Sequence, residues 1–408
     1  MSFQQGLSGL NAAAKNLDVI GNNVANANTV GFKQSQAQFS DVFANSLSGG
    51  SGGTQAGIGV KVSTIAQQFN QGVVTTSNNP LDIAISGSGF YRLNDQGAIS
   101  YSRNGQFHID KDGYVVNGTG LRLTGYPANA SGAIDTSAPT DLRVSAADLP
   151  PTSTTQVTGL VNLDSREAAL SSAAFDPADP ATYHGSTSLS VHDSLGNPSA
   201  LSAYFVKTGA NTWDVFAANE GAVLNGGAPV GALNFLSNGA LDPLSPSTFT
   251  ITAPVATGAV NPLVFDMSFA GTTQFGSDFS VNALSQDGFT SGRLTGFAVS
   301  ENGVIRGSYS SGKFLDLGQI ALANFANPQG LEVRGNNVWG ESAASGAALV
   351  GTPDTAGLGV LQSGAVEDSN VELTSELVNM ITAQRVYQAN AQTIKTQDQL
   401  LQTIVNLK

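Results

Sequence analysis

Cysteine is absent from the 408 residues, so the chain has no disulfide, no thiolate nucleophile and no cysteine metal ligand. Charged residues are scarce at 12%, but 41% of the residues are hydrophobic, which is enough to bury cores and excludes a disordered chain. No apolar run approaches the roughly 20 residues that a membrane span needs. The start, MSFQQGLSGL, has neither the basic nor the apolar region of a secretory signal. The length predicts roughly two to four domains.

Basic residues are few, and the charge is unevenly distributed. The formal net charge is −13; residues 1–45 carry no net charge and residues 365–408 carry −2, so the middle carries −11. Neutral ends can pack closely, whereas an acidic middle keeps exposed regions soluble. Because no basic stripe is available to neutralise phosphates, we expect no nucleic-acid partner. Because no apolar run is long enough to span a bilayer, we expect no membrane insertion.

Residues that carry catalysis or bind metals are also scarce. His108, His184 and His192 have no metal-ligand spacing. Residues 49–53 formally match the G-x-S-x-G nucleophile motif, but no strand–turn–helix pattern surrounds them. Residues 110–113 resemble the opening of a calcium loop but lack its later acidic positions, so a hairpin turn is the better interpretation. We therefore expect no catalytic residue, no metal site, no cofactor and no enzymatic activity.

Most of the chain has the pattern of short strands joined by tight turns. Leu81–Ile85 and Phe90–Leu93 have the composition and alternation of strands. Asn104-Gly105, Asp112-Gly113 and Asn302-Gly303 favour the positive φ angles of hairpin turns. The sequence therefore predicts a mixed, mainly β fold with two β-rich domains, one inserted in the other.

The two ends differ from this middle and match each other. Apolar and small residues recur at steps of three and four over residues 3–24, and again over the last forty residues. Such spacing follows one stripe of an α-helix and requires another helix to cover it. We expect helices at about 3–27 and 371–407 that pair as a coiled-coil-like domain, the second with a capping box at Ser369 and Glu372.

We call the residues of these two stripes the predicted seam and expect them to pack subunits together. An ordinary intramolecular coiled coil is the alternative, but the second helix carries more apolar surface than pairing with one helix covers. The predicted seam comprises Phe3, Leu7, Leu10, Ala14, Leu17, Val24, Leu373, Leu377, Met380, Tyr387, Ala391, Ile394, Leu401 and Val405.

An aromatic pair, Phe39 and Phe43, lies in a segment otherwise rich in serine and glutamine. Residues four apart share one side of a helix. From the residues alone, a small packing contact beneath the following Gly/Ser loop is the preferred interpretation.

These patterns divide the chain into four parts. The helical domain comprises 1–30 and 366–408, and 31–70 is a connecting loop or linker. The first β domain comprises 71–145 and 288–365, and 146–287 is an inserted outer β domain whose ends lie close together.

Long motifs at both ends, with one stretch of the first β domain, resemble the bacterial flagellar rod and hook protein family. They cover roughly 1–145 and 288–408, and the resemblance is weak across the inserted region. The matching stretches are Gly9–Ala13, Asn16–Asn26, Val30–Lys33, Asn79–Ile85, Gly87–Phe90, Ser369–Leu373, Leu377–Ile381, Ala383–Arg385, Tyr387–Ala391 and Ile394–Thr396.

The resemblance implies a structural subunit of a hollow tube. Rod proteins lack room for an inserted outer domain, so the length favours the hook branch of the family. Copies of such a subunit would assemble into the curved, flexible universal joint that transmits torque from motor to filament and forms part of the export channel. The terminal helices would form the inner tube, with the β domains outside it.

The resemblance also implies partners and a location. It implies export through the flagellar type III apparatus, without a cleaved signal peptide, to the extracellular hook. Its partners would be the hook cap protein, the distal rod protein, the hook–filament junction protein and the export gate. Phe39 and Phe43 match the aromatic pair that export substrates present to that gate, and a chain without cysteine suits passage unfolded through a narrow channel.

Two other functions stay open from the sequence. Within the family, the chain could be a distal rod or hook–filament junction protein. Outside it, a secreted β-rich adhesin or hydrolase is the remote alternative, which would need a clustered catalytic set or a signal peptide.

Overall fold

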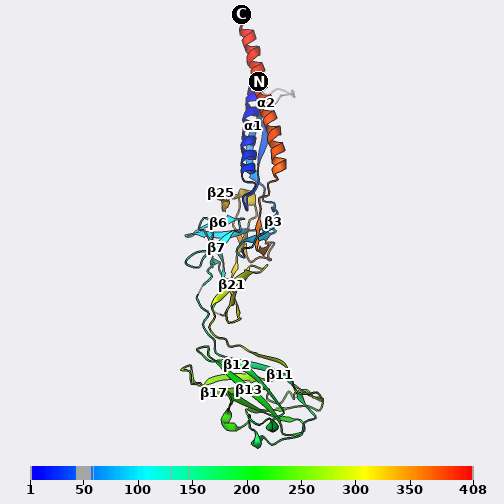
Figure 1. Ribbon diagram of the computed structural model, residues 1–408. Helices are drawn as coiled ribbons and strands as arrows, with labels where there is room; N and C mark the ends of the chain where they lie inside the picture. The colour runs from blue at the N-terminus through cyan, green and yellow to red at the C-terminus, as the bar shows by residue number, and fades with distance from the viewer. Residues whose placement is uncertain (1, 43–56, 58, 130, 146, 407–408) are drawn as a thin grey trace. The chain divides into compact units, whose positions relative to one another are not determined.

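The computed structural model describes residues 2–42, 57, 59–129, 131–145 and 147–406 (Figure 1). The chain forms two compact units. Unit 1 comprises Met1–Ser145, Phe297–Gly307 and Leu315–Lys408, and unit 2 comprises Ala146–Gly296 and Ser308–Phe314. The predicted fold class, mainly β with a helix at each end, is confirmed. Among the described residues, no helix is both long enough and apolar enough to span a membrane.

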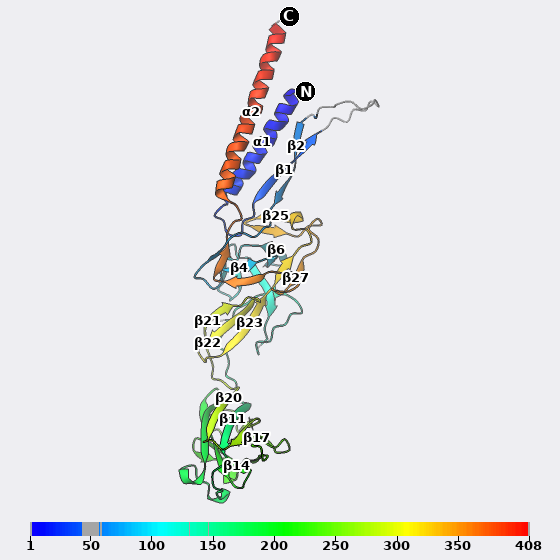
Figure 2. The ribbon, with the colours of Figure 1, turned by 90° about the vertical axis from the view of Figure 1, so that its right-hand side faces the viewer.

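The two terminal helices pack side by side (Figure 2). They are α1 (Ser2–Ala25) and α2 (Leu373–Asn406). Glycines let them approach closely: a Cβ atom on Gly6 would lie 3.1 Å from Ile394 Cγ1, and one on Gly9 would lie 2.8 Å from Asn390 Oδ1. The glycines that weaken α1 as an isolated helix therefore shape its contact with α2.

The predicted capping box does not form. Helix α2 begins at Leu373, directly after Glu372, so Ser369 stands too far upstream to cap it. The Ser369 hydroxyl instead accepts a hydrogen bond from Val371 N at 3.3 Å.

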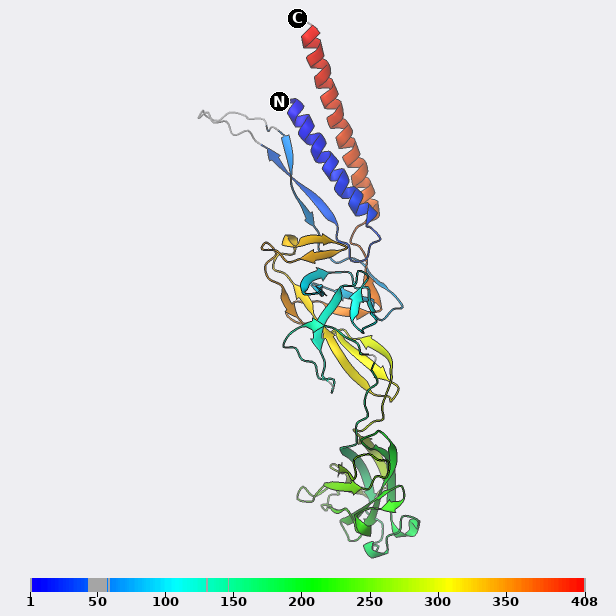
Figure 3. The same cartoon turned by 90° about the vertical axis from the view of Figure 1, so that its left-hand side faces the viewer.

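A hairpin beside α1 occupies part of the segment expected to be a linker (Figures 2 and 3). Strands β1 (Ser35–Val42) and β2 (Gly59–Gln67) pair antiparallel, and both contact α1. The sequence did not predict it because most side chains of β1 are polar, so no apolar period of two is visible. Phe39 therefore lies on a strand and not on a helix.

Most of the β part of unit 1 is formed by a sheet that draws its strands from both halves of the chain. Its main path runs β21-β22-β23-β9-β5-β6-β26-β25, and separate pairs join β28 to β4 and β29 to β3. The strands before the unit 2 sequence are β3 (Val74–Thr76), β4 (Ile83–Ser86), β5 (Phe90–Asp95), β6 (Ala98–Ser102), β7 (Phe107–Ile109), β8 (Val115–Asn117), β9 (Arg122–Pro127) and β10 (Thr140–Asp141). Those from Leu294 onward are β21 (Leu294–Val299), β22 (Val304–Tyr309), β23 (Phe314–Ile320), β24 (Leu322–Asn324), β25 (Glu332–Gly335), β26 (Val338–Gly340), β27 (Leu349–Gly351), β28 (Val360–Ser363) and β29 (Ala365–Glu367).

An aromatic cluster forms part of the core of unit 1. Phe69 and Trp339 pack edge to face on Phe90, with ring centroids 5.5 and 5.8 Å away, and Tyr101 packs on Phe325 at 4.7 Å. Edge-to-face aromatic pairs stabilise a fold beyond the contribution of the apolar area that they bury.

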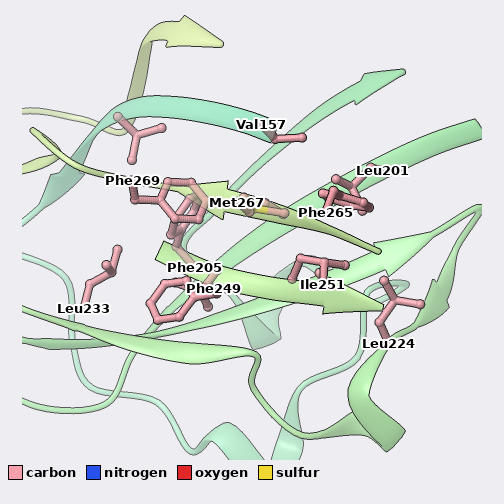
Figure 4. Close-up of a cluster of buried hydrophobic side chains, with 14 of the residues drawn as sticks. Val157, Leu201, Phe205, Leu224, Leu233, Phe249, Ile251, Phe265, Met267 and Phe269 are labelled. Carbon is pink, nitrogen blue, oxygen red and sulfur yellow. The ribbon is translucent and has the colours of Figure 1, made fainter. Parts of the chain in front are cut away.

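Unit 2 is built from two five-stranded sheets around one hydrophobic core (Figure 4). Alternation is regular in β17 and β18, where Phe249, Ile251, Phe265 and Met267 point inward. One sheet has β11 (Gln156–Asp164), β17 (Thr248–Ala253), β18 (Leu263–Ser268), β19 (Thr273–Phe275) and β20 (Ser280–Gln286). The other has β12 (Gly185–His192), β13 (Pro198–Lys207), β14 (Thr212–Asn219), β15 (Ala222–Val223) and β16 (Gly231–Asn234).

Two of the three predicted hairpin turns are confirmed. Asp112-Gly113 joins β7 to β8, and Asn302-Gly303 joins β21 to β22, with Gly113 and Gly303 at positive φ. The hairpin at Asn104-Gly105 is wrong, because β6 pairs with β5 and β26 while β7 pairs with β8. Gly105 serves another purpose: a Cβ atom there would lie 1.7 Å from Ile83 O.

Gly105→Ala is therefore expected to destabilise unit 1 by about 1–3 kcal/mol, the usual cost of overpacking a tight site. Urea unfolding can be followed by Trp339 fluorescence in a Trp213→Phe background, which leaves a single tryptophan. Gly118→Ala is the control, because a Cβ atom there meets nothing within 4 Å. Equal stability of the two variants would contradict the assigned role of Gly105.

Candidate assembly interface

The face of α1 that is buried within the chain is not the predicted seam. Ala12, Ala13, Val19, Ile20 and Asn23 are buried against the rest of unit 1. On the predicted seam, by contrast, Phe3 and Leu7 are each 45% exposed, and Leu10, Ala14, Leu17 and Val24 are half-buried. The seam and the intrachain contact are thus two different stripes of one helix.

On α2, some residues of the predicted seam are half-buried and others are exposed. Met380, Ala391 and Ile394 are half-buried, and Ile394 lies against Gly6 of α1. Tyr387 is exposed at 37%, and Leu373, Leu377 and Leu401 are exposed at 44–54%. The side chain of Val405 lies outside the described residues.

Further apolar residues widen the exposed surface of α2. Val378, Ile381, Val386 and Leu400 are exposed alongside the seam residues. These side chains lie on more than one side of α2, and a helix that is apolar on several sides requires neighbours on several sides.

Phe39 lines an open groove of about 660 Å³ between α1, α2 and the β1–β2 hairpin. Its side chain is 41% exposed. Phe43, its predicted companion in export, lies outside the described residues, as does the G-x-S-x-G match at 49–53.

Below the helices, a buried ion cluster ties three segments of the chain together. Lys33 Nζ lies 2.7 Å from Glu367 Oε1, and Arg103 Nε lies 3.3 Å from Glu367 Oε2. The side chains of Lys33 and Glu367 are fully buried, and that of Arg103 is 3% exposed. Backbone groups complete the cluster: Glu367 accepts from Gly72 N at 2.9 Å, and Lys33 donates to Asn70 O at 2.7 Å.

Burial governs the electrostatics of this cluster. It lowers the pKa of Lys33 and the pKa of Arg103, because a charged group loses its hydration, and the Glu367 carboxylate opposes both shifts. Burial also raises the pKa of Tyr91, whose hydroxyl donates to Ile83 O. The phenol therefore stays neutral and serves as a hydrogen-bond donor.

A second polar network fixes the base of the helices. Asn23 of α1 donates to Ser35 O at 2.8 Å and accepts from Ser35 N at 2.9 Å. Glu376 of α2 accepts from Gln34 Nε2 at 2.8 Å, and Asn370 accepts from Gln34 N at 2.7 Å. These bonds join α1, α2 and the start of β1, so they hold the helix pair in one register beside the β1–β2 hairpin.

Sequence reasoning missed this polar junction, by which we mean both networks. Lys33 and Glu367 are 334 residues apart, and no spacing rule connects them. The available signal was that Lys33 and Glu367 each follow a stretch of apolar and small residues, residues 30–32 and 364–366. Charges in such settings are buried only when they are paired.

The residues weighed for catalysis or metal binding lie apart. His108 is exposed on β7, and His184 accepts from Lys207 N at 3.1 Å through Nδ1. Asp110 accepts hydrogen bonds from Asp112 N and Tyr114 N, and these bonds stabilise a hairpin turn. Within the described part of the chain, no group of three or more histidine, aspartate or glutamate residues could hold a metal ion.

Glu367→Gln is expected to destabilise unit 1 more than Lys33→Met does. Loss of the carboxylate leaves two buried cations uncompensated, a cost of about 3–5 kcal/mol. Loss of Lys33 leaves the Arg103–Glu367 pair balanced, so its cost is smaller. Urea unfolding followed by Trp339 measures both, and Asp18→Asn in the exposed Lys15–Asp18 pair is the control, with a change of about 0.5 kcal/mol or less. An equal or larger effect of Lys33→Met would contradict this reading.

Family models match the chain in four separate stretches. Residues 3–33 match the flagella basal body rod protein model, and residues 84–158 match the flagellar hook protein FlgE/F/G D1 domain. Residues 162–289 match the flagellar basal body protein FlaE D2 domain, and residues 362–407 match the flagellar basal body rod FlgEFG protein C-terminal model.

Whole-chain relatives agree with these models. The chain is 43% identical to the flagellar hook protein FlgE of Escherichia coli strain K12, with all of both chains covered. It is 36% identical to the flagellar hook protein FlgE of Borreliella burgdorferi, over all of this chain and 99% of that protein. The crystal structure of Helicobacter pylori flagellar hook protein FlgE2 has a similar fold, with a TM-score of 0.55 at 14% identity, covering 72% of this chain and all of that one. With its two terminal helices, its β body and relatives of this similarity along its full length, the chain belongs to the flagellar hook protein family.

Proposed function

We propose that the chain is a structural subunit of the bacterial flagellar hook, which polymerises with copies of itself into a hollow, curved, flexible tube that transmits motor torque to the filament. The observation that carries this function is the apolar surface left exposed on α1 and α2. Phe3 and Leu7 on α1, and Leu373 and Leu377 on α2, are about half exposed. In a family of hook proteins, neighbouring copies are the natural cover for such a surface.

Burial of this surface supplies the driving force for assembly. Each Å² of apolar surface removed from water contributes about 25 cal/mol. Helices along a tube can cover one another repeatedly, because each copy presents the same stripes to the next. The two helical segments carry little net charge, so close packing between copies meets little repulsion.

The polar junction suits the transmission of torque. A load applied to the helices must pass to the sheet of unit 1 through the segments that Glu367 and Asn370 join. Bonds such as Lys33 Nζ to Glu367 Oε1 at 2.7 Å and Gln34 N to Asn370 Oδ1 at 2.7 Å fix that connection in one geometry. We infer that the helices and this sheet turn together while the acidic outer parts slide during bending.

The proposal extends to the layout of the subunit in the tube. Residues 1–30 and 366–408 form the inner tube around the export channel, and 71–145 with 288–365 form the β layer around it. Residues 146–287 form an inserted outer domain. The charge of −11 in the middle of the chain supports an exposed outer position.

We also propose an export route for the subunit and the proteins that it meets. The subunit leaves the cell through the flagellar type III apparatus without a cleaved signal peptide. It meets the export gate, the hook cap protein, the distal rod protein and the hook–filament junction protein. Phe39 and Phe43 are the pair that we assign to recognition by the gate.

Electron microscopy of the concentrated, purified chain tests the central proposal. Curved hollow tubes are the expected product. Monomers that stay dispersed at high concentration, under conditions in which a relative's hook protein forms tubes, would overturn it.

Leu7→Asn combined with Leu377→Asn is expected to raise the critical concentration for tube formation by at least about tenfold. Each leucine loses apolar burial between copies that is worth about 1 kcal/mol. Because both side chains are about half exposed in the monomer, its unfolding free energy should change little. Asn11→Ala with Gln392→Ala, at exposed polar positions of the same helices, is the control. Normal assembly of the leucine variant, measured by sedimentation, would remove these residues from the interface.

Phe39→Ala combined with Phe43→Ala is expected to reduce the secreted amount severalfold while the chain still folds. The reason is the loss of the aromatic pair that the gate recognises. Phe275→Ala with Phe314→Ala removes two other phenylalanines, which are 50% and 69% exposed, and should leave secretion unchanged. A quantitative secretion assay decides, and wild-type export of the Phe39/Phe43 variant would contradict the assignment.

A further inference from the structure

The open groove between α1, α2 and the β1–β2 hairpin has the size and lining of a binding site. Its volume of about 660 Å³ lies within the range of pockets that hold ligands, about 300–1,000 Å³. Small side chains such as Ala12 and Ala383 line it and leave it unfilled. Phe39 and Val386 also line it, and their side chains are 41% and 48% exposed.

The groove offers no free charge to a partner. Among the described residues that line it, Glu376 alone is charged. Its side chain is buried, and it accepts from Gln34 Nε2 at 2.8 Å and from Asn23 Nδ2 at 3.3 Å. A highly charged segment would lose its hydration in the groove without gaining a counter-charge, so an apolar partner of low net charge fits best.

The end of α2 has these properties. By the α2 end we mean residues 395–406, which lie past the position where α2 contacts the start of α1 (Figure 3). Leu400 and Leu401 of the α2 end are 53% and 54% exposed. Its two charged residues, Lys395 and Asp398, are opposite in sign and cancel. The α2 end is therefore an apolar helical segment without net charge.

The lengths of the groove and of the α2 end agree. The α2 residues that line the groove lie between Glu376 and Asn390, a stretch of about 21 Å at 1.5 Å per residue. The α2 end spans about 18 Å on the same measure. Because α2 is one continuous helix through both stretches, a chain cannot place its own α2 end in its own groove. Only the α2 end of a second copy can reach it.

We propose that the groove binds the α2 end of a neighbouring copy of this chain, with Leu400 and Leu401 packed among its apolar side chains. The inference rests on the self-assembly proposed above and names one contact that propagates it. Groove and α2 end are different surfaces of one protein, so their contact is heterologous. Such a contact repeats from copy to copy and builds an open, directional filament wherever its rotation does not close a ring.

Cross-linking between introduced cysteines tests this contact, because the chain has no cysteine of its own. Thr382 is exposed in the groove, and Thr403 is exposed on the α2 end. Within one copy they stand about 32 Å apart along the same helix, too far for a short bismaleimide. Tubes of the Thr382→Cys/Thr403→Cys chain should give a ladder of covalent dimers, trimers and larger oligomers. Each single variant should give no ladder, because one thiol per copy cannot extend a chain of links.

The outcomes separate this contact from the proposed function. Tubes of the double variant that give no ladder overturn the contact and leave the function standing. Ser51→Cys with Thr382→Cys tests residues 43–56 of the same chain as the occupant, and a link within single chains in place of the ladder also overturns the contact. If the wild type forms no tubes, the proposed function fails and this contact fails with it.

A charge placed in the groove gives a second measurement. Thr382→Arg should raise the critical concentration for tube formation about tenfold relative to Thr393→Arg, because docking would bury the added guanidinium without a partner. The two threonines are matched: both are exposed on α2, and each hydroxyl donates to the carbonyl four residues earlier at 3.0 Å. Thr393 does not line the groove. Equal critical concentrations of the two variants would overturn the proposal.

Discussion

Most of unit 1 depends on one buried carboxylate, that of Glu367. It joins Lys33, just after α1, to Arg103, just after β6, and its own backbone oxygen accepts from Gly31 N at 2.8 Å. Buried ion pairs add little net stability relative to apolar residues of the same size. We infer that their effect here is specificity, because a misplaced segment would leave a buried charge without its partner.

With the base fixed, the helices can divide their surfaces between two purposes. Toward α2, helix α1 presents small residues: Gly6 and Gly9 admit Ile394 and Asn390 of α2 at close range. The contact between the helices buries few large apolar side chains, and leucines such as Leu7 and Leu377 lie outside it. A helix pair packed through leucines would have covered the surface that we assign to neighbouring copies.

The sequence predicted the parts of the fold that local pattern determines. The heptad spacing located both helices, and Asp112-Gly113 located a hairpin, because period and turn chemistry are local. The hairpin at Asn104-Gly105 was wrong because the chain passes close beside Ile83 there, a contact that only tertiary structure sets. The heptad spacing also could not say which stripe of α1 packs internally, since glycine contacts carry no apolar signal. The junction around Glu367 was missed because its partners are hundreds of residues apart.

The unequal lengths of the helices connect folding to assembly. At 1.5 Å per residue, the 34 residues of α2 span about 51 Å and the 24 residues of α1 about 36 Å. Ile394 of α2 already lies beside Gly6, near the start of α1, so Leu400 and Leu401 extend past the region that α1 can cover. A helix end without tertiary contacts is marginal in water. We infer that the last turns of α2 gain their full stability only when another copy covers them. Their ordering is then part of polymerisation, whereas the base of the helices is already held by the polar junction within one chain.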